Sequence, residues 1–197
     1  MKIKKHIPNL LTLGNLFCGT IAAIFAVESN FTGAALFVVI GILFDFLDGF
    51  VARLLKVSGD LGTQLDSLAD MVTSGVVPGI VMFNLLMNNE NSGFSYSETE
   101  TMAWKSFSVN LIQFIGLILT LGACYRLAKF NLDTRQTDSF IGLPTPAMCL
   151  FVVSLPLIQE YSEIEFVQNL ISNNYFLIGI TLVLTYLMNA ELPLFSL

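Results

Sequence analysis

Charge is what this sequence has least of. Only 12% of its 197 residues are Asp, Glu, Lys or Arg, whereas 54% are hydrophobic. A soluble domain of ordinary composition carries roughly 25% charged residues. Apolar stretches recur from one end of the chain to the other with brief polar interruptions, which leaves no segment for a separate soluble domain. The composition therefore predicts an integral membrane protein with a single domain over residues 1–197.

Cysteine and histidine are also scarce. Cys18, Cys124 and Cys149 lie in different apolar segments without CxxC or Cys/His spacing, which argues against a disulfide framework or a zinc site and favours buried free thiols. The single His6 is interpreted as an interfacial residue of a basic N-terminal arm. No glycine-rich phosphate loop is present, because Gly59–Gly62 lacks the strand, the lysine and the spacing of one.

Six stretches approach the ~20 residues that a helix needs to cross a bilayer. The fifth is short and contains Pro144, Pro146 and Pro156, which a membrane helix tolerates only when neighbours satisfy the freed backbone groups. No A-x-A-like cleavage site follows the basic N-terminus, so the first stretch is interpreted as a span and not as a signal peptide. The predicted fold is an all-α, polytopic bundle of about six transmembrane helices: Asn9–Val27, Gly33–Leu54, Ala69–Met87, Ser108–Leu127, Leu143–Ile158 and Tyr175–Leu192.

The basic residues predict the orientation, because cytoplasmic loops carry an excess of Lys and Arg. With the N-terminus in the cytoplasm, Lys105 is the only basic residue outside. The other eight are then cytoplasmic: Lys2, Lys4, Lys5, Arg53, Lys56, Arg126, Lys129 and Arg135. We therefore expect a multi-pass protein of the cell membrane with a cytoplasmic N-terminus.

Four aspartates stand out at the ends of two predicted membrane helices. Asp45 and Asp48 are three residues apart, and Asp66 and Asp70 are four apart. Both intervals place a pair on one face of a helix. The turn between the helices, Lys56–Leu61, is short enough to make them antiparallel neighbours. The two pairs are therefore expected to converge.

Carboxylates at membrane depth are costly, about 2.5–3.5 kcal/mol each on the cheaper insertion scale, and neighbouring ones repel each other. Arg53 alone does not balance four acids. Mg²⁺ and Mn²⁺ prefer oxygen ligands and commonly bind a few carboxylates together with substrate phosphates. The four aspartates therefore predict a divalent-metal site, although a single aspartate in such a place would more simply cap a helix, as we expect of Asp60.

The segment from Asp45 to Asp70 resembles the signature of the CDP-alcohol phosphotransferase family, D-x2-D-G-x2-A-R-x8-G-x3-D-x3-D. All eight fixed positions of that pattern are matched: Asp45, Asp48, Gly49, Ala52, Arg53, Gly62, Asp66 and Asp70. The six-span layout extends the resemblance over nearly the whole chain. It implies a homodimeric enzyme with its active site on the cytoplasmic side, acting on lipid in the bilayer and on no nucleic acid.

The resemblance also implies roles for residues. The four aspartates would hold two divalent cations, Mg²⁺ or Mn²⁺, and Asp70 would in addition accept the proton of the attacking alcohol. Asn9 and Thr12, in a further family element at the start of the first span, would approach the CDP group of the donor lipid together with four residues of the signature: Gly49, Ala52, Arg53 and Gly62.

The acceptor alcohol has to be inferred from other segments. Residues 123–131 and 140–147, with 7–9 and 15–19, resemble the phosphatidylserine synthase branch of this family, which transfers a phosphatidyl group from CDP-diacylglycerol to L-serine. A guanidinium suits the carboxylate of serine. Arg126 is therefore a candidate anchor, although the positive-inside rule alone would also place it there. Asn131 is a weaker candidate for the serine amino group.

Two alternatives remain open at this stage. Glycerol 3-phosphate or an inositol phosphate is a possible acceptor in the same reaction, but a phosphate dianion calls for several convergent basic residues, and few are present. A divalent-ion or proton-coupled transporter also uses intramembrane acids. Such acids usually lie near mid-bilayer in broken or repeated helices, whereas these lie at helix ends.

Overall fold

The computed structural model describes residues 6–57, 59–89, 111–132, 139–191 and 193–196. Helices dominate it, and one short pair of strands joins the chain after α5 to the chain after α8. The helices are α1 (His6–Val27), α2 (Phe31–Leu55), α3 (Asp60–Asp70), α4 (Val77–Asn88), α5 (Ile118–Leu132), α6 (Thr145–Tyr161), α7 (Glu165–Ile171) and α8 (Asn174–Asn189). The strands are β1 (Ser139–Ile141) and β2 (Pro193–Ser196), which pair antiparallel.

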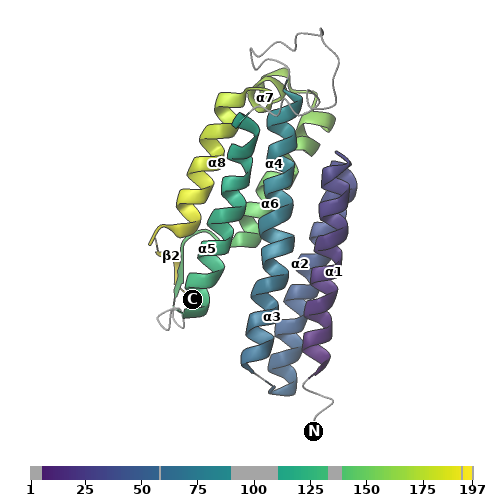
Figure 1. Ribbon diagram of the computed structural model, residues 1–197, viewed down its shortest axis with the longest axis vertical. Coiled ribbons are helices and arrows are strands. Elements are labelled where there is room, and N and C mark those ends of the chain that lie inside the picture. The colour runs from purple at the N-terminus through teal and green to yellow at the C-terminus, as the bar shows by residue number, and fades with distance from the viewer. Residues whose placement is uncertain (1–5, 58, 90–110, 133–138, 192, 197) are drawn as a thin grey trace, which may run out of the picture.

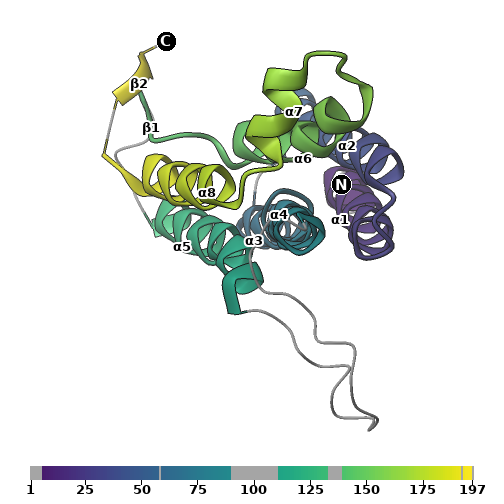
Figure 2. The same cartoon turned by 90° about the horizontal axis from the view of Figure 1, so that it is seen from above.

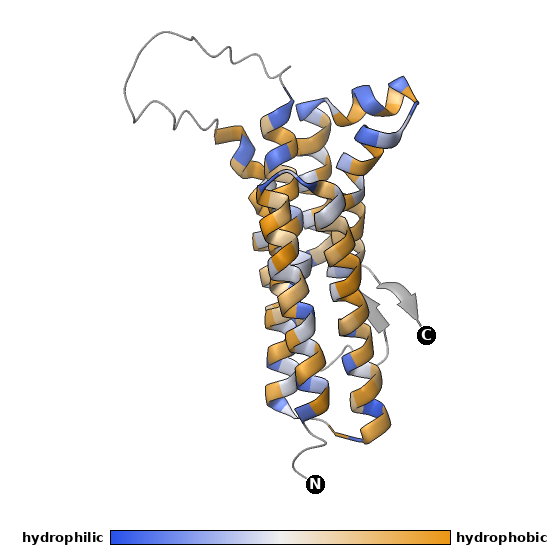
Figure 3. Cartoon of the chain, turned by 90° about the vertical axis from the view of Figure 1, so that its right-hand side faces the viewer, coloured by the Kyte–Doolittle hydropathy of each residue, from blue (hydrophilic) through white to orange (hydrophobic). Residues whose placement is uncertain are grey.

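The predicted helical membrane bundle is confirmed, and its span count is refined. Among the described residues, four helical stretches are long and apolar enough to cross a membrane: His6–Val27, Phe31–Leu55, Asp60–Asn88 and Leu111–Leu132. α7 and α8 pass the same test only together and are bent by 71°, which gives a fifth span if the pair counts as one. Hydrophobic residues run along the helices, and hydrophilic residues gather toward the two ends of the bundle (Figure 3).

The stretch predicted as the fifth span forms α6, a helix of 17 residues that is not among the candidate spans above. Pro144 is its N-cap and Pro146 lies in the first turn, where a missing N–H costs no hydrogen bond. Pro156 is the one proline inside the helix.

Five of the basic residues used to predict the orientation lie outside the described residues. They are the predicted cytoplasmic Lys2, Lys4, Lys5 and Arg135 and the predicted external Lys105.

The third span begins earlier than predicted. Its helix starts at Asp60, not near Ala69, and runs to Asn88 through a π-helical stretch, Met71–Val76, between α3 and α4. The hydropathy signal missed the first turns because they are polar. As a result, the turn after α2 is shorter than predicted, and Asp66 and Asp70 both lie on α3.

The third span is the central element of the bundle. Seen from above, α1 and α2 lie on one side of α3 and α4, and α5 and α8 lie on another (Figure 2). In its most apolar window 61% of the residues are buried, against 33% or less in the other three spans. Val77, Val81 and Met82 of α4 are fully buried. A side chain on the third span therefore meets neighbours from several helices.

Small and polar residues form the buried face of α1. The buried residues recur at intervals of three or four, as expected of one helix face: Pro8, Thr12, Asn15, Cys18, Gly19, Ala22 and Ala26. Small side chains let membrane helices approach closely. α1 packs along α2 and α3, and all three meet at the end of the bundle where α1 begins (Figure 1). The aspartates are near this end.

Candidate metal and substrate site

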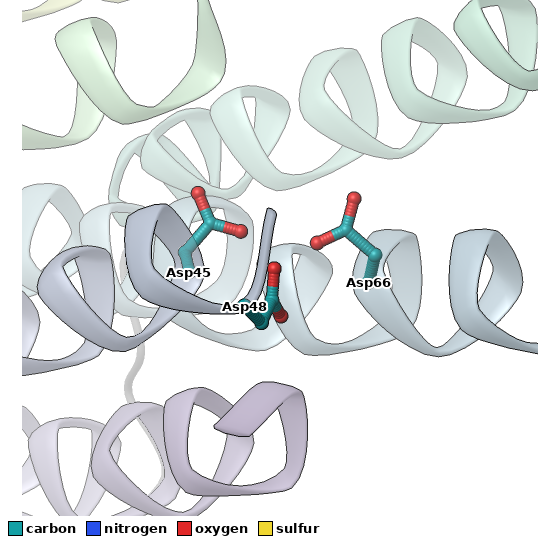
Figure 4. Close-up of side chains that lie close together, drawn as sticks. All are labelled: Asp45, Asp48 and Asp66. Atoms are coloured by element: carbon teal, nitrogen blue, oxygen red, sulfur yellow. The ribbon is translucent and has the colours of Figure 1, made fainter. Parts of the chain in front are cut away.

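Three of the four aspartates converge in space. Asp45 and Asp48 come from the last turns of α2, and Asp66 comes from α3. Each offers a carboxylate oxygen, and these oxygens lie within 4.8 Å of one another. Figure 4 shows the three carboxylates turned toward one another from the two helices. The short connection between α2 and α3 turns the chain back, so that the carboxylates of α2 meet that of α3, and α1 packs against both helices.

Asp70 lies one helical turn beyond Asp66 and is not part of this trio. Its Oδ1 accepts a hydrogen bond of 3.1 Å from the Asn15 side chain of α1. Asp48 is the most enclosed of the four, with 7% of its surface exposed, and it accepts a hydrogen bond from Thr12. Polar residues of α1 thus hold one carboxylate of each pair.

In the described part of the chain, no basic side chain forms an ion pair with these carboxylates. The one ion pair among the described residues joins Lys129 and Glu191, 3.2 Å apart, at the ends of α5 and α8. Arg53 is exposed, and its Nε donates to the carbonyl of Gly49 at 3.1 Å, one turn back on its own helix. An all-oxygen donor set that is close-packed and without a cationic partner fits hard divalent cations such as Mg²⁺ or Mn²⁺.

A pocket of about 230 Å³ opens beside the carboxylates. Asp48 and Asp66 face into it from α2 and α3, and the start of α1 closes one side. Five of the six residues predicted to contact the CDP-lipid line it: Asn9, Thr12, Gly49, Ala52 and Gly62. The other lining residues are Pro8, Val57, Gly59, Leu61 and Thr63. The structure therefore brings these five residues together with two metal-ligand candidates, whereas Arg53 does not line the pocket.

Glycine shapes the pocket at two positions. A Cβ added at Gly49 would meet no atom within 4 Å, so this residue leaves open space in the pocket wall. A Cβ at Gly62 would lie 3.4 Å from Oδ1 of Asn9, across the pocket. Missing bulk on both walls lets a ligand approach the backbone closely.

The two residues predicted to contact serine have different surroundings. Asn131 of α5 exchanges hydrogen bonds with Ser67, which follows Asp66 directly, at 2.9 and 3.1 Å. Arg126, five residues earlier on α5, donates to the carbonyls of Met188 and Gly142 at 2.6 and 3.4 Å. Asn131 therefore approaches the acidic cluster through Ser67, and Arg126 lies where the ends of α5 and α8 meet the chain before α6.

Sequence reasoning missed several polar residues of this region. Thr63 lines the pocket, Ser67 pairs with Asn131, and Thr73 bonds to Asn15. The spacing of these residues could have predicted that they share a helix face with the aspartates. Intervals of three or four residues separate the members of this set: Thr63, Asp66, Ser67 and Asp70. Asn15 follows Thr12 by three residues and extends the polar face of α1 in the same way.

The fold and the site together define a polytopic membrane protein with a cluster of carboxylates that could hold a metal ion, beside a pocket at one end of its helices. Comparison of the sequence with known families identifies the class more closely. The profile of the CDP-alcohol phosphatidyltransferase family matches residues 5–187, and the chain belongs to this family.

Curated relatives are found in bacteria, archaea and yeast. The chain is 34% identical over 155 residues to CDP-diacylglycerol–serine O-phosphatidyltransferase of Bacillus subtilis (strain 168), covering 76% of this chain and 75% of the relative. It is 32% identical to the protein of the same name from Helicobacter pylori (strain J99), covering 78% and 58%. It is 28% identical to archaetidylserine synthase of Methanothermobacter thermautotrophicus, covering 81% and 61%. The chain thus spans about three fifths of the latter two proteins.

Proposed function

We propose that this chain transfers the phosphatidyl group of CDP-diacylglycerol to the hydroxyl of L-serine, giving phosphatidylserine and CMP, as a step of phospholipid biosynthesis. The observation that carries the proposal is the convergence of Asp45, Asp48 and Asp66 beside the pocket that five predicted CDP-lipid contacts line. Family membership and the serine-transferase names of the relatives support it.

In this reaction the serine oxygen forms a bond to the phosphorus that carries the diacylglycerol, and the bond from that phosphorus to the CMP oxygen breaks. The serine hydroxyl loses its proton, and CMP leaves with the bonding electron pair. Catalysis of such a transfer consists mainly of positioning and of stabilising negative charge. The residues at this site are suited to both tasks.

The four aspartates would hold two divalent cations, Mg²⁺ or Mn²⁺, of which Asp45, Asp48 and Asp66 form the compact part of the ligand set. Bound there, the cations would neutralise charge on the diphosphate and on the departing CMP. Thr12 orients Asp48 by its hydrogen bond. Asn9, Thr12, Gly49, Ala52 and Gly62 line the space for the CDP group, and Arg53 is proposed to turn from the Gly49 carbonyl toward its phosphates.

Asp70 is proposed to take the proton of the serine hydroxyl. It lies one turn from Asp66 and outside the compact trio, and only its Oδ1 is engaged by Asn15. A carboxylate near the cluster but not wholly committed to it is suited to act as a general base.

Serine would bind on the α5 side of the cluster. Asn131 contacts Ser67 beside Asp66, and Arg126 offers a guanidinium five residues earlier on the same helix. A guanidinium presents five N–H donors in a planar fork that matches a carboxylate. We therefore propose that Arg126 anchors the serine carboxylate and that Asn131 contacts its amino group.

Arg126→Ala is expected to raise the KM for serine at least about tenfold, because a lost charge-assisted hydrogen bond is worth roughly 1.5–3 kcal/mol. The KM for CDP-diacylglycerol should change much less. The matched control is Lys129→Ala, which removes a cation one turn away that pairs with Glu191 at the surface. An unchanged serine KM in Arg126→Ala would assign Arg126 to tying the ends of α5 and α8 together.

Gly49→Ala is expected to leave the thermal stability unchanged or slightly higher, because an added Cβ meets no atom and alanine favours helix. The same methyl group would narrow the pocket, so the KM for CDP-diacylglycerol should rise about tenfold or more. Gly179→Ala is the control, since its Cβ also meets nothing but lies on α8, away from the pocket. Normal kinetics in Gly49→Ala would show that the CDP-lipid binds elsewhere.

The exposed apolar side chains of α1 and α2, among them Phe17, Leu36 and Phe46, are proposed to face lipid or a second copy in a homodimer of the cell membrane. The N-terminus and the active site are proposed to be cytoplasmic, because Arg53, Lys56, Arg126 and Lys129 lie near the helix ends on that side.

The direct test of the function is to supply labelled serine and CDP-diacylglycerol to membranes containing the protein. Labelled phosphatidylserine that disappears with a chelator supports it, and no labelled lipid refutes it.

A further inference from the structure

Asn15 lies at the centre of a buried hydrogen-bond network that joins three elements. It is fully buried on α1. Its Nδ2 donates to Oδ1 of Asp70 at 3.1 Å, and its Oδ1 accepts from the hydroxyl of Thr73 at 2.8 Å. An ionised carboxylate only accepts hydrogen bonds, so the amide nitrogen has to face Asp70 and the amide oxygen has to face Thr73. The network therefore has one orientation.

Thr73 belongs to the π-helical stretch that follows Asp70 directly. A π-helical turn alters the register of a helix and occurs often at functional sites. Here it is held by its neighbours, because the carbonyl of Gly75 accepts from Thr120 of α5 at 2.9 Å and the carbonyl of Thr73 accepts from Cys149 of α6 at 3.4 Å. The backbone that positions Thr73 is thus fixed from two sides.

Two glycines make room for the network. A Cβ at Gly19 of α1 would lie 2.2 Å from Oγ1 of Thr73 and 3.0 Å from its Cα. A Cβ at Gly41 of α2 would lie 3.0 Å from Oδ1 of Asn15 and 3.0 Å from Cγ2 of Thr73. The helices therefore close around the Asn15 and Thr73 side chains, which leaves them little freedom to move.

We propose that Asn15 is a positioning residue for Asp70: locked by Thr73, its amide holds Oδ1 of Asp70 and leaves the other carboxylate oxygen directed to the reacting groups. The proposal rests on the phosphatidyl transfer proposed above. Groups that orient a reactive or ligating side chain typically contribute about 10- to 100-fold to activity. Thr73 acts on Asp70 only through Asn15.

Kinetics of four variants test this role in the purified protein. Asn15→Ala is expected to lower kcat about 10- to 100-fold with KM for CDP-diacylglycerol and serine within about threefold of wild type. Thr73→Val should lower kcat less, and Thr73→Ser, which keeps the hydroxyl, should restore it. Because Thr73 acts through Asn15, the double variant Asn15→Ala/Thr73→Val should have the kcat of Asn15→Ala alone.

The control is Asn84→Ala, which removes another buried asparagine whose Nδ2 donates 2.6 Å to a backbone carbonyl, that of Ala26, away from the aspartates. It should lower thermal stability as Asn15→Ala does but keep kcat near wild type. A kcat in Asn15→Ala no lower than in Asn84→Ala would overturn the proposal. The proposal would also be overturned if Thr73→Val lowered kcat as much in the Asn15→Ala protein as it does in wild type.

A measurement without substrate separates positioning from support of the metal ligands. Mn²⁺ should keep most of its effect on the melting temperature in Asn15→Ala, because three of the four proposed ligands, Asp45, Asp48 and Asp66, form the compact trio that does not include Asp70. Loss of the Mn²⁺ effect would assign Asn15 to building the cluster and overturn the proposal. If wild type itself released no CMP, the proposed function would fail instead.

Discussion

Asp66→Asn is expected to lower turnover by roughly 10³-fold or more, since a metal ion supplies several kcal/mol of charge stabilisation and each 1.36 kcal/mol is tenfold in rate. Asp66 is the one member of the trio that comes from α3. Its replacement would remove the proposed ligand that α3 contributes to the cluster. CMP release with CDP-diacylglycerol, serine and saturating Mn²⁺ measures the loss.

The same variant is expected to be more stable than wild type when no metal is present. Asp45, Asp48 and Asp66 repel one another at close range, and neutralising one of them relieves that repulsion. The melting temperature in a chelator should therefore rise by a few degrees, and the further rise that Mn²⁺ causes in wild type should largely disappear.

Asp60→Asn is the matched control, because it makes the same chemical change six residues earlier on α3, at an exposed first-turn position. It should keep its turnover and its response to Mn²⁺, and its stability in chelator should not rise, because a carboxylate there suits the helix dipole. An Asp66→Asn protein that remained active, or that behaved as Asp60→Asn does, would contradict the assignment of a metal site.

Asp70→Asn is expected to lose about 10²- to 10⁴-fold in kcat, which is the usual contribution of a general base. An asparagine at this position still offers an oxygen to the Asn15 amide, so the packing around it should persist. Binding of CDP-diacylglycerol, measured by the protection it gives against thermal unfolding, should be retained.

The Mn²⁺ response distinguishes the two aspartates of α3. If Asp70 acts mainly as the base, Asp70→Asn keeps most of the rise in melting temperature that Mn²⁺ causes, whereas Asp66→Asn loses it. Near-normal turnover of Asp70→Asn would remove Asp70 as the base. Loss of the Mn²⁺ response together with turnover would make it a metal ligand first.

The acidic cluster was predictable because its information is local. Intervals of three and four residues fix the side of a helix on which Asp45, Asp48, Asp66 and Asp70 lie, and a short turn fixes the pairing of the two helices. In the structure, carboxylate oxygens of Asp45, Asp48 and Asp66 lie within 4.8 Å of one another. The helical class followed equally from hydropathy, because a chain in lipid has to satisfy its backbone hydrogen bonds internally.

Features that depend on contacts between distant segments were not predictable. The third helix begins at Asp60, and α3 packs against α1, although hydropathy favoured a start near Ala69. The π-helical stretch accepts hydrogen bonds from Thr120 and Cys149, which follow it in the sequence by more than 40 residues. The pairing of β1 with β2 likewise joins segments that hydropathy treats separately.

The directions of side chains at the helix ends could also not be predicted from the sequence. Arg53 belongs to the matched signature, yet its side chain folds back on Gly49, and its contact with the CDP-lipid stays a prediction. Arg126 was expected near serine on charge alone, and the structure adds its hydrogen bonds to Met188 and Gly142. Long cationic side chains have several staggered conformations, so spacing places their Cα atoms better than their charges.

The central claim is that this protein uses a metal-loaded aspartate cluster to transfer a phosphatidyl group to serine. The most direct test is CMP release by the purified protein in detergent with CDP-diacylglycerol and Mn²⁺ or Mg²⁺, adding serine, glycerol 3-phosphate or an inositol phosphate in turn. We predict release with serine alone, abolished by a chelator. Release with another acceptor would contradict the assignment of serine, and the absence of metal-dependent release with every acceptor would contradict the account as a whole.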